Sequence, residues 1–216
     1  LLAVFASFMI ALRSLLVHVR KVLLPLCRFH SVEARKNLSM IVGRDTANLN
    51  RREISRAALE TLSESLGDGI ISPLFYLMLF GLPGIFMYRM ANTMDSMLGH
   101  KDERYHDFGW AAARFDDLLN LIPARLCGIL FIPLAFLLVN GRFFSAFKTA
   151  LTDSAKHKSP NAGWLEAAVA GGFGIRLGGL NHYDGEAQEY PVMNASSVRS
   201  ASPRFIFSGM KIIAIA

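Results

Sequence analysis

Two long apolar stretches constrain the fold of this chain more than any other feature of its sequence. Residues 69–86 contain no charged side chain, and residues 121–139 contain a single one, Arg125. Because a helix rises about 1.5 Å per residue, either stretch can cross the hydrocarbon core of a bilayer. The chain is 52% hydrophobic and only 19% charged, which is too apolar for an ordinary soluble domain. We therefore predict an all-α polytopic integral membrane protein with re-entrant or interfacial helices, forming one domain over residues 1–216.

The first apolar stretch contains helix-breaking residues. Pro73 lies near its start, and Gly-Leu-Pro-Gly occupies positions 81–84. If residues 69–86 cross the membrane once, the polar sequence after residue 88 lies on the opposite side from the basic sequence after residue 17. If they fold back as a re-entrant hairpin, both lie on the cytoplasmic side.

A polar block, residues 88–125, mixes acidic, basic and amide side chains between two apolar segments. It contains no run of one sign, which argues against a simple electrostatic tether and for a polar pocket with specific partners. The alternative is a solvated loop between membrane helices. The formal charge of +6 does not indicate nucleic acid, because the basic residues mostly flank apolar segments, as membrane topology requires.

The start of the chain resembles the end of a membrane helix. Residues 1–17 are apolar apart from Arg13, and several basic residues follow them, which is typical of a cytoplasmic helix end. Residues 205–216 form another apolar segment that is too short to span. We therefore expect the chain to be truncated at both ends.

Two further helices and one loop are predicted from local signals. Asn50 and Glu53 form a capping-box pattern for a helix over residues 50–66, which the glycines after it can stop. Ser159 and Pro160 suit the start of a second helix, which is rich in small residues and runs toward Gly171. Residues 181–204 are polar and turn-rich, so we predict a flexible loop there.

Three carboxylates, those of Glu60, Glu64 and Asp68, share one face of the predicted helix. Hard oxygen ligands in this pattern are a usual way for a helical protein to bind Mg²⁺. The alternative is that Arg56 pairs with Glu60 on a wet surface. The acidic face leads directly into an uncharged segment, which favours the metal site.

The polar block contains further paired groups. Asn92 and Asp95 lie one turn apart, so they need partners if they are buried. In the next predicted helix, Arg114 and Asp117 are three residues apart, and Asp116 and Asn120 are four apart. Such groups reach neighbouring helices, although Arg114 and Asp117 could form only a local ion pair. Ionisable groups near membrane depth are rare unless they serve a function.

Two turns could bind anions. Gly43 to Thr46 precede a helix, and their backbone N–H groups, with Arg44 and the Thr46 hydroxyl, could hold phosphate. A second polar cluster, which includes His157 and Asn161, also precedes a helix, although a histidine in a polar loop is more often simply solvated. The sequence contains no P-loop, Rossmann, GxSxG or HExxH motif, and its two cysteines indicate neither a disulfide nor a zinc site.

Four long strings then point to one family. They are SMIVGRDT (39–46), EISRAALETLSESLGDGIISPLFY (53–76), YRMANTMDSMLGHKDERYHDFGWAAARFDDLLNLIPARL (88–126) and KHKSPNAGWLEAAVAGGFGIRLGG (156–179). They closely resemble the CobD/CbiB family, the membrane-bound adenosylcobinamide-phosphate synthases of cobalamin biosynthesis. The sequence after Tyr183 carries none of these strings, so nothing is transferred onto it.

The resemblance implies a carbon–nitrogen ligase. ATP is consumed while the propionate carboxylate of adenosylcobyric acid is joined to the amine of (R)-1-aminopropan-2-ol phosphate, with Mg²⁺ offsetting phosphate charge. The predicted catalytic residues are Asp95, Arg114, Asp116 and Asp117. The predicted metal ligands are Glu60, Glu64 and Asp68. The predicted substrate- and phosphate-binding residues are Arg44, Asp45, Thr46, Asn92, Arg104, Asn120, Arg125, His157 and Asn161.

The resemblance also implies a location and partners. Family members lie in the bacterial cytoplasmic membrane as multi-pass proteins, and both substrates with ATP are cytosolic, so we expect the motifs to meet on the cytoplasmic side. This expectation favours the re-entrant hairpin. The expected partners are membrane lipid, the corrinoid and the amino-alcohol phosphate, together with other membrane enzymes of cobamide assembly, and no nucleic acid. The competing hypothesis is a non-enzymatic signalling or transport protein with the same architecture.

Overall fold

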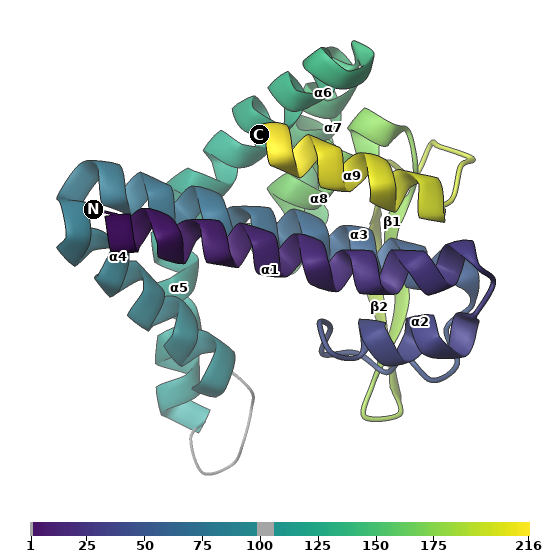
Figure 1. The fold of residues 1–216 in the computed structure, drawn as a ribbon, viewed down its shortest axis with the longest axis horizontal. Coiled ribbons are helices and arrows are strands. Elements are labelled where there is room, and N and C mark those ends of the chain that lie inside the picture. Colours follow the sequence, from purple (N-terminus) through teal and green to yellow (C-terminus); the bar gives the residue numbers. More distant parts are fainter. Residues whose placement is uncertain (1, 99–105) are drawn as a thin grey trace.

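The structure is a computed structural model that describes residues 2–98 and 106–216, and helices dominate it (Figure 1). The elements follow in the order α1 (Leu2–Cys27), α2 (Ser31–Leu38), α3 (Arg51–Leu66), the π-helical turn η1 (Gly67–Ile71), α4 (Ser72–Leu98), α5 (His106–Leu126), a second π-helical turn η2 (Cys127–Phe131), α6 (Ile132–Asn140), α7 (Phe143–Asp153), the 3₁₀ turn η3 (Ser154–Lys156), α8 (Ala162–Phe173), β1 (Leu177–Tyr183), β2 (Glu186–Met193) and α9 (Pro203–Ile215).

The capped helix predicted over residues 50–66 is present as α3. The Asn50 side chain accepts hydrogen bonds from the backbone N–H groups of Arg52 and Glu53, and the Glu53 carboxylate accepts one from the Asn50 N–H at 2.7 Å. This reciprocal arrangement satisfies donors that the first helical turn would otherwise leave unpaired. The prediction that Gly67 and Gly69 end the helix is wrong, because both adopt helical geometry within η1 and the chain continues into α4.

Helix α4 folds back on itself at Gly81. This residue has φ 64° and ψ −148°, which are not helical, and Pro83 follows it. The returning half packs against the outgoing half and η1: the Tyr88 ring stacks on Tyr76 with centroids 5.4 Å apart, the Tyr88 hydroxyl donates to the Asp68 carbonyl at 3.3 Å, and Arg89 donates to the Gly69 carbonyl at 3.0 Å. Figure 1 shows the turn at the left end of the molecule. The predicted fold-back of this segment is therefore confirmed.

Two helical segments in the described residues, the first of them bent back at Gly81, are long and apolar enough to cross a membrane by length and composition. They cover Arg51–Met97 and Gly109–Asn140. Large apolar side chains are exposed around the α4 turn and along α6, and they include Met78, Leu79, Phe80, Leu82, Phe86, Leu134, Leu137 and Leu138. Exposed apolar surface of this extent marks contact with lipid or with another protein. The multi-pass arrangement itself remains a prediction.

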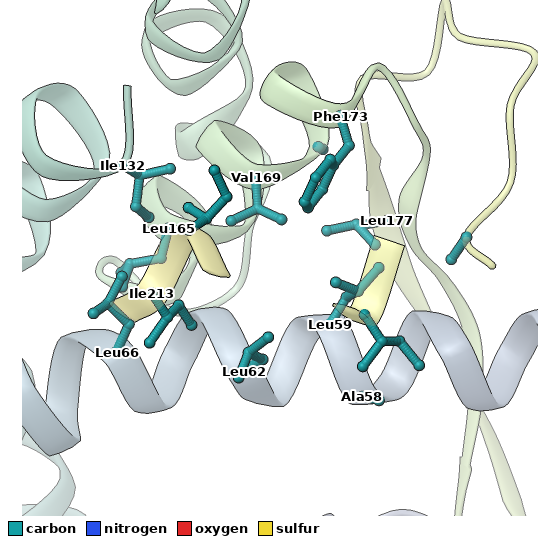
Figure 2. Close-up of a cluster of buried hydrophobic side chains, with 14 of the residues drawn as sticks. Ala58, Leu59, Leu62, Leu66, Ile132, Leu165, Val169, Phe173, Leu177 and Ile213 are labelled. Carbon is teal, nitrogen blue, oxygen red and sulfur yellow. The ribbon is translucent and has the colours of Figure 1, made fainter. Parts of the chain in front are cut away.

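The hydrophobic core lies where α3 meets α8 and α9. In Figure 2, Leu59, Leu62 and Leu66 of α3 face Leu165, Val169 and Phe173 of α8, with Leu177 of β1 and Ile213 of α9 alongside. Helix α8 begins at Ala162, slightly later than predicted, and the Ser159 hydroxyl accepts its Asn161 and Ala162 N–H groups at 3.2 Å each. Its small residues permit close contact, as predicted, since a side chain at Gly172 would overlap the Phe136 ring.

Residues 181–204 are not the flexible loop that was predicted. Strands β1 and β2 form an antiparallel hairpin in which Tyr183 pairs with Glu186, so Asp184 and Gly185 make a two-residue turn with positive φ at both positions. An Asp-Gly pair of this kind is a strong hairpin signal, and the polar composition obscured it. Only the segment after Met193 is irregular, up to the start of α9. The fold is thus mainly helical with one small sheet.

Candidate functional site

A cavity of about 590 Å³ lies between the acidic face of α3 and the β-hairpin. Its wall is built from five parts of the chain that are distant in sequence. The polar side chains that line it are those of Arg44, Glu60, Thr61, Glu64, Ser65, Asp68, Asn92, Ser96, His157, Lys158, Ser159, Glu166, Asn181, Tyr183 and Tyr190. Two of the predicted blocks therefore meet here, as the re-entrant hairpin requires.

The three carboxylates predicted on α3 all line this cavity, but they differ in their surroundings. Glu60 is only 2% exposed; its carboxylate accepts hydrogen bonds from Arg44 at 2.6 Å and from the Gly178 N–H at 2.8 Å. Arg56 Nε lies 3.8 Å from the same carboxylate. The Arg56–Glu60 pair therefore exists, although inside the protein and not on a wet surface. Glu60 joins the loop before α3 to the hairpin.

Gly178 makes that junction possible. It interrupts the strand pairing as a bulge between Leu177 and Gly179, with φ 82°, and a side chain there would overlap the Pro191 carbonyl. Its N–H therefore points at Glu60 while its carbonyl accepts from Arg56 at 2.5 Å. Bulges of this kind re-aim backbone groups next to functional sites, and glycine supplies the conformation at little cost.

Two members of the predicted phosphate-binding turn line the described cavity, Gly43 and Arg44. Burial opposes the charge of the arginine, but the Glu60 carboxylate outweighs this effect and raises the pKa of Arg44. Its guanidinium also donates to Asn181 Oδ1 at 2.9 Å. Asp45 instead accepts from the Gly185 N–H at 2.8 Å, in the hairpin turn, and Thr46 is buried. The structure places Asp45 as an anchor of the hairpin.

Glu166 of α8 is a cavity residue that the sequence reasoning missed. It is 5% exposed, its carboxyl group lies within hydrogen-bonding reach of Glu64, and His157 Nε2 is 3.7 Å away. Burial, together with the negative charges of Glu60 and Glu64, raises the pKa of Glu166 well above its usual value. Burial lowers the pKa of His157. A single acidic residue in an otherwise apolar helix was the signal that could have identified it.

Several polar residues of the central block form a network next to the cavity. Asp116 accepts hydrogen bonds from Asn92 at 3.2 Å and from Asn120 at 2.9 Å. Asn120 Oδ1 in turn accepts from the Tyr88 hydroxyl at 2.9 Å and from Ser72 at 2.6 Å. Asn92 is the group of this network that also reaches the cavity. The network holds α4 and α5 in a fixed relation beside the site.

Four further predicted site residues do not line the described cavity, namely Arg114, Asp117 and Arg125 of α5 and Asn161. Asp117 accepts from the Asn161 amide at 3.3 Å and lies 3.6 Å from Arg114. The Arg114 side chain is 62% exposed, so this pair is weak. Arg125 donates to the Leu121 carbonyl at 2.6 Å and lies over the Trp164 ring. The predicted catalytic and binding roles of Arg114, Asp117, Arg125 and Asn161 remain predictions.

The remaining predicted site residues are Asp95 and Arg104. Asp95 is half-buried on α4, and its charge acts on both Asp68 and Asp116. It therefore lies between the cavity and the network. Arg104 is outside the described residues.

No three His, Cys, Asp or Glu side chains in the described part of the chain converge closely enough to hold a metal ion. The α3 carboxylates are instead spread along one cavity wall. Mg²⁺ in enzymes is commonly held by one or two carboxylates together with phosphate oxygens of the substrate. The donor set fits such a shared site and does not fit a dedicated protein cage.

Comparison with known proteins places the chain in a family. A sequence profile described as "CobD/Cbib protein" matches residues 1–212. The chain belongs to the CobD/CbiB family. The match extends through the β-hairpin, beyond the strings on which the resemblance rested.

Several relatives of the CobD/CbiB family are close in sequence. The chain is 45% identical over 199 residues to a protein of Brucella anthropi named "Cobalamin biosynthesis protein CobD", which covers 91% of this chain and 60% of the relative. Proteins of the same name from Geobacter metallireducens and Halalkalibacterium halodurans are 48% and 43% identical, covering 85% and 87% of this chain and 58% and 59% of the relatives. The chain thus spans about three fifths of the relatives' length. No solved structure matches the chain.

Proposed function

We propose that this protein acts in cobalamin biosynthesis as an ATP-dependent carbon–nitrogen ligase. The reaction joins the propionate carboxylate of adenosylcobyric acid to the amine of (R)-1-aminopropan-2-ol phosphate and gives adenosylcobinamide phosphate. The observation that carries this proposal is the cavity of about 590 Å³, which combines four acidic side chains with Arg44, His157 and Lys158. A cavity of mixed charge suits a reaction whose substrates bring both an ammonium and phosphate groups.

The acidic side of the cavity suits the amine. Glu64 and Glu166 lie close together, from α3 and α8, and Asp68 extends the same wall by one turn. An ammonium group placed between Glu64 and Glu166 would offset the repulsion between their two carboxylates. One of these carboxylates then accepts the proton that the amine must lose before it can attack a carbonyl carbon.

The basic residues suit phosphate. Lys158 is exposed at the cavity wall, whereas Arg44 is held in place by Glu60 and Asn181. Together they would bind the transferred phosphoryl group and the phosphate of the amino alcohol. Glu64 and Asp68 supply oxygen atoms that would complete the coordination of a phosphate-bound Mg²⁺, which would neutralise charge on the nucleotide.

The proposed ligation proceeds in two chemical steps. The substrate carboxylate attacks the terminal phosphorus of ATP, which releases ADP and forms an acyl phosphate. The amine nitrogen then attacks the acyl carbon, the carbon–oxygen bond to phosphate breaks, and inorganic phosphate leaves. The nitrogen's proton passes to Glu64 or Glu166. The role of these residues is to hold both reactants together and to exclude water from the acyl phosphate.

The decisive assay uses the full-length protein in nanodiscs with adenosylcobyric acid, the amino-alcohol phosphate, ATP and Mg²⁺. We expect product with the wild type, and a loss of turnover of at least about a hundredfold with Glu64→Gln or Glu166→Gln. Glu33→Gln, in an exposed residue of α2, is the matched control and should keep full activity. Corrinoid binding without any product would instead support a carrier or signalling role.

The proposed site faces the cytoplasm of a bacterial inner membrane. This placement predicts that Asn48→Cys and Ser96→Cys, in a variant lacking Cys27 and Cys127, react with an impermeant maleimide from the same side of sealed vesicles. Labelling from opposite sides would contradict the re-entrant arrangement in the membrane.

A further inference from the structure

A second cavity, of about 560 Å³, is lined by arginines and lies apart from the acidic one. Arg51 and Arg52 come from the first turn of α3, Arg199 from the segment that leads into α9, and Arg204 from the first turn of α9. Ser200 and Ser202 also line it. We call these six residues the arginine basin. The proposed ligase chemistry uses none of them.

The charges of the arginine basin lack internal compensation. Among the described residues, no carboxylate forms an ion pair with Arg51, Arg52, Arg199 or Arg204, although several other arginines of the chain have such partners. Glu53, which lines an adjoining cavity, accepts a hydrogen bond from the Asn50 N–H in the α3 cap. Four guanidinium groups around one cavity repel each other, and this repulsion is relieved when an anion enters.

Buried polar atoms at the basin also lack partners. Arg51 donates through one terminal nitrogen to the Leu26 carbonyl at 2.9 Å and lies over the Phe29 ring, but its buried Nε has no hydrogen-bond partner. The Ser202 hydroxyl, at the N-cap of α9, is likewise buried and unpaired. The first turn of α9 contains no acidic residue. A negatively charged ligand in the basin would compensate the arginine charges and the positive end of the α9 dipole.

We propose that the arginine basin binds a phosphate-bearing anion at a site separate from the acidic cavity. Arginine favours phosphate because its planar guanidinium donates two parallel hydrogen bonds to two phosphate oxygens. The anion can come from two sources, a soluble phosphate ester or oligophosphate, and the headgroup of an anionic lipid. Both present the same phosphate oxygens to the arginines.

The basin is separated from the acidic cavity by the Gly178 bulge. An adjoining cavity of about 300 Å³ shares Arg52 and Ser200 with the basin and Gly178 with the acidic cavity. Arg56 and Glu60 hold Gly178 from its two sides. Substitutions of exposed basin arginines therefore leave the ligase residues in place, and a failure of this proposal is distinguishable from a failure of the ligase proposal.

The test measures anion binding to the full-length protein in a neutral detergent. The double variant Arg52→Gln/Arg199→Gln removes two exposed charges of the basin, and Arg13→Gln/Arg20→Gln, on the exposed side of α1, is the charge-matched control. One arm titrates inorganic tripolyphosphate by calorimetry, and the other titrates short-chain phosphatidylglycerol against phosphatidylcholine. Thermal unfolding of each variant verifies that it is folded.

We expect the basin variant to weaken binding of at least one anion by about tenfold or more, while the control changes it by less than about twofold. Loss confined to tripolyphosphate identifies a soluble phosphate ligand, and loss confined to phosphatidylglycerol identifies a lipid. If wild type and basin variant bind both anions equally, or if neither anion binds to the wild type, the proposal is overturned.

Discussion

Glu60 is the residue whose removal tests most directly how the site is held together. Its carboxylate is the shared acceptor of Arg44, at 2.6 Å, and of the Gly178 N–H, at 2.8 Å. The side chains of Arg44 and Glu60 are 13% and 3% exposed, so solvent screens their attraction little. Glu60→Ala therefore leaves a buried guanidinium with a weaker partner and a backbone donor with none.

The expected loss follows from these contacts. Removing one partner of a buried ion pair costs about 3–5 kcal/mol, because the remaining charge is left uncompensated. Glu60→Gln keeps an acceptor oxygen for one of the two donors but loses the charge, so we expect half of that loss, roughly 1.5–2.5 kcal/mol. The free energy of unfolding should therefore be highest for the wild type, lower for Glu60→Gln and lowest for Glu60→Ala.

Chemical unfolding in mixed detergent micelles measures these differences. Glu33→Ala is the control, since Glu33 and its partner His30 are both more than half exposed, and it should change stability by less than about 0.5 kcal/mol. If Glu60→Gln were as stable as the wild type, the Glu60 charge would not hold Arg44 and the hairpin together, and the reasoning would be wrong.

Three further substitutions test other parts of the fold. Tyr88→Phe removes the hydroxyl that donates to Asn120 at 2.9 Å and should cost about 1–2 kcal/mol in the same unfolding assay, whereas no change would show the network to be dispensable. Gly128→Ala places a methyl group 2.6 Å from the Trp164 carbonyl, so we expect a loss of about 1–3 kcal/mol from the forced separation of η2 and α8. Burial opposes ionisation of Asp153, but hydrogen bonds from Lys156, the Asn194 N–H and Thr152 prevail and lower its pKa. Its stabilisation should therefore be present above the unfolded-state pKa of about 3.9 and be lost as the pH falls through the lower folded-state value, and Asp153→Asn should remove this acid-dependent part of the unfolding curve.

The local signals in the sequence determined several elements correctly. The Asn50–Glu53 capping box specified the start of α3, because both hydrogen bonds form between residues three apart. The spacing of Glu60, Glu64 and Asp68 fixed them on one face, since a helix repeats every 3.6 residues. The Gly81–Gly84 break predicted where α4 turns back. Each of these predictions depends on neighbours along the chain.

The sequence could not determine which faces of the helices and strands pack against each other. Glu166 approaches Glu64 only because α8 packs on α3, and Gly178 donates to Glu60 across 118 residues of sequence. Periodicity assigns a side chain to a face but leaves the partner of that face open. For the same reason Asp116 and Asn120, which were predicted as site residues, could not be distinguished from a supporting network. Composition and spacing thus determined the start of α3, the break in α4 and the acidic stripe, whereas tertiary packing decided which charges share a cavity and which hold its walls.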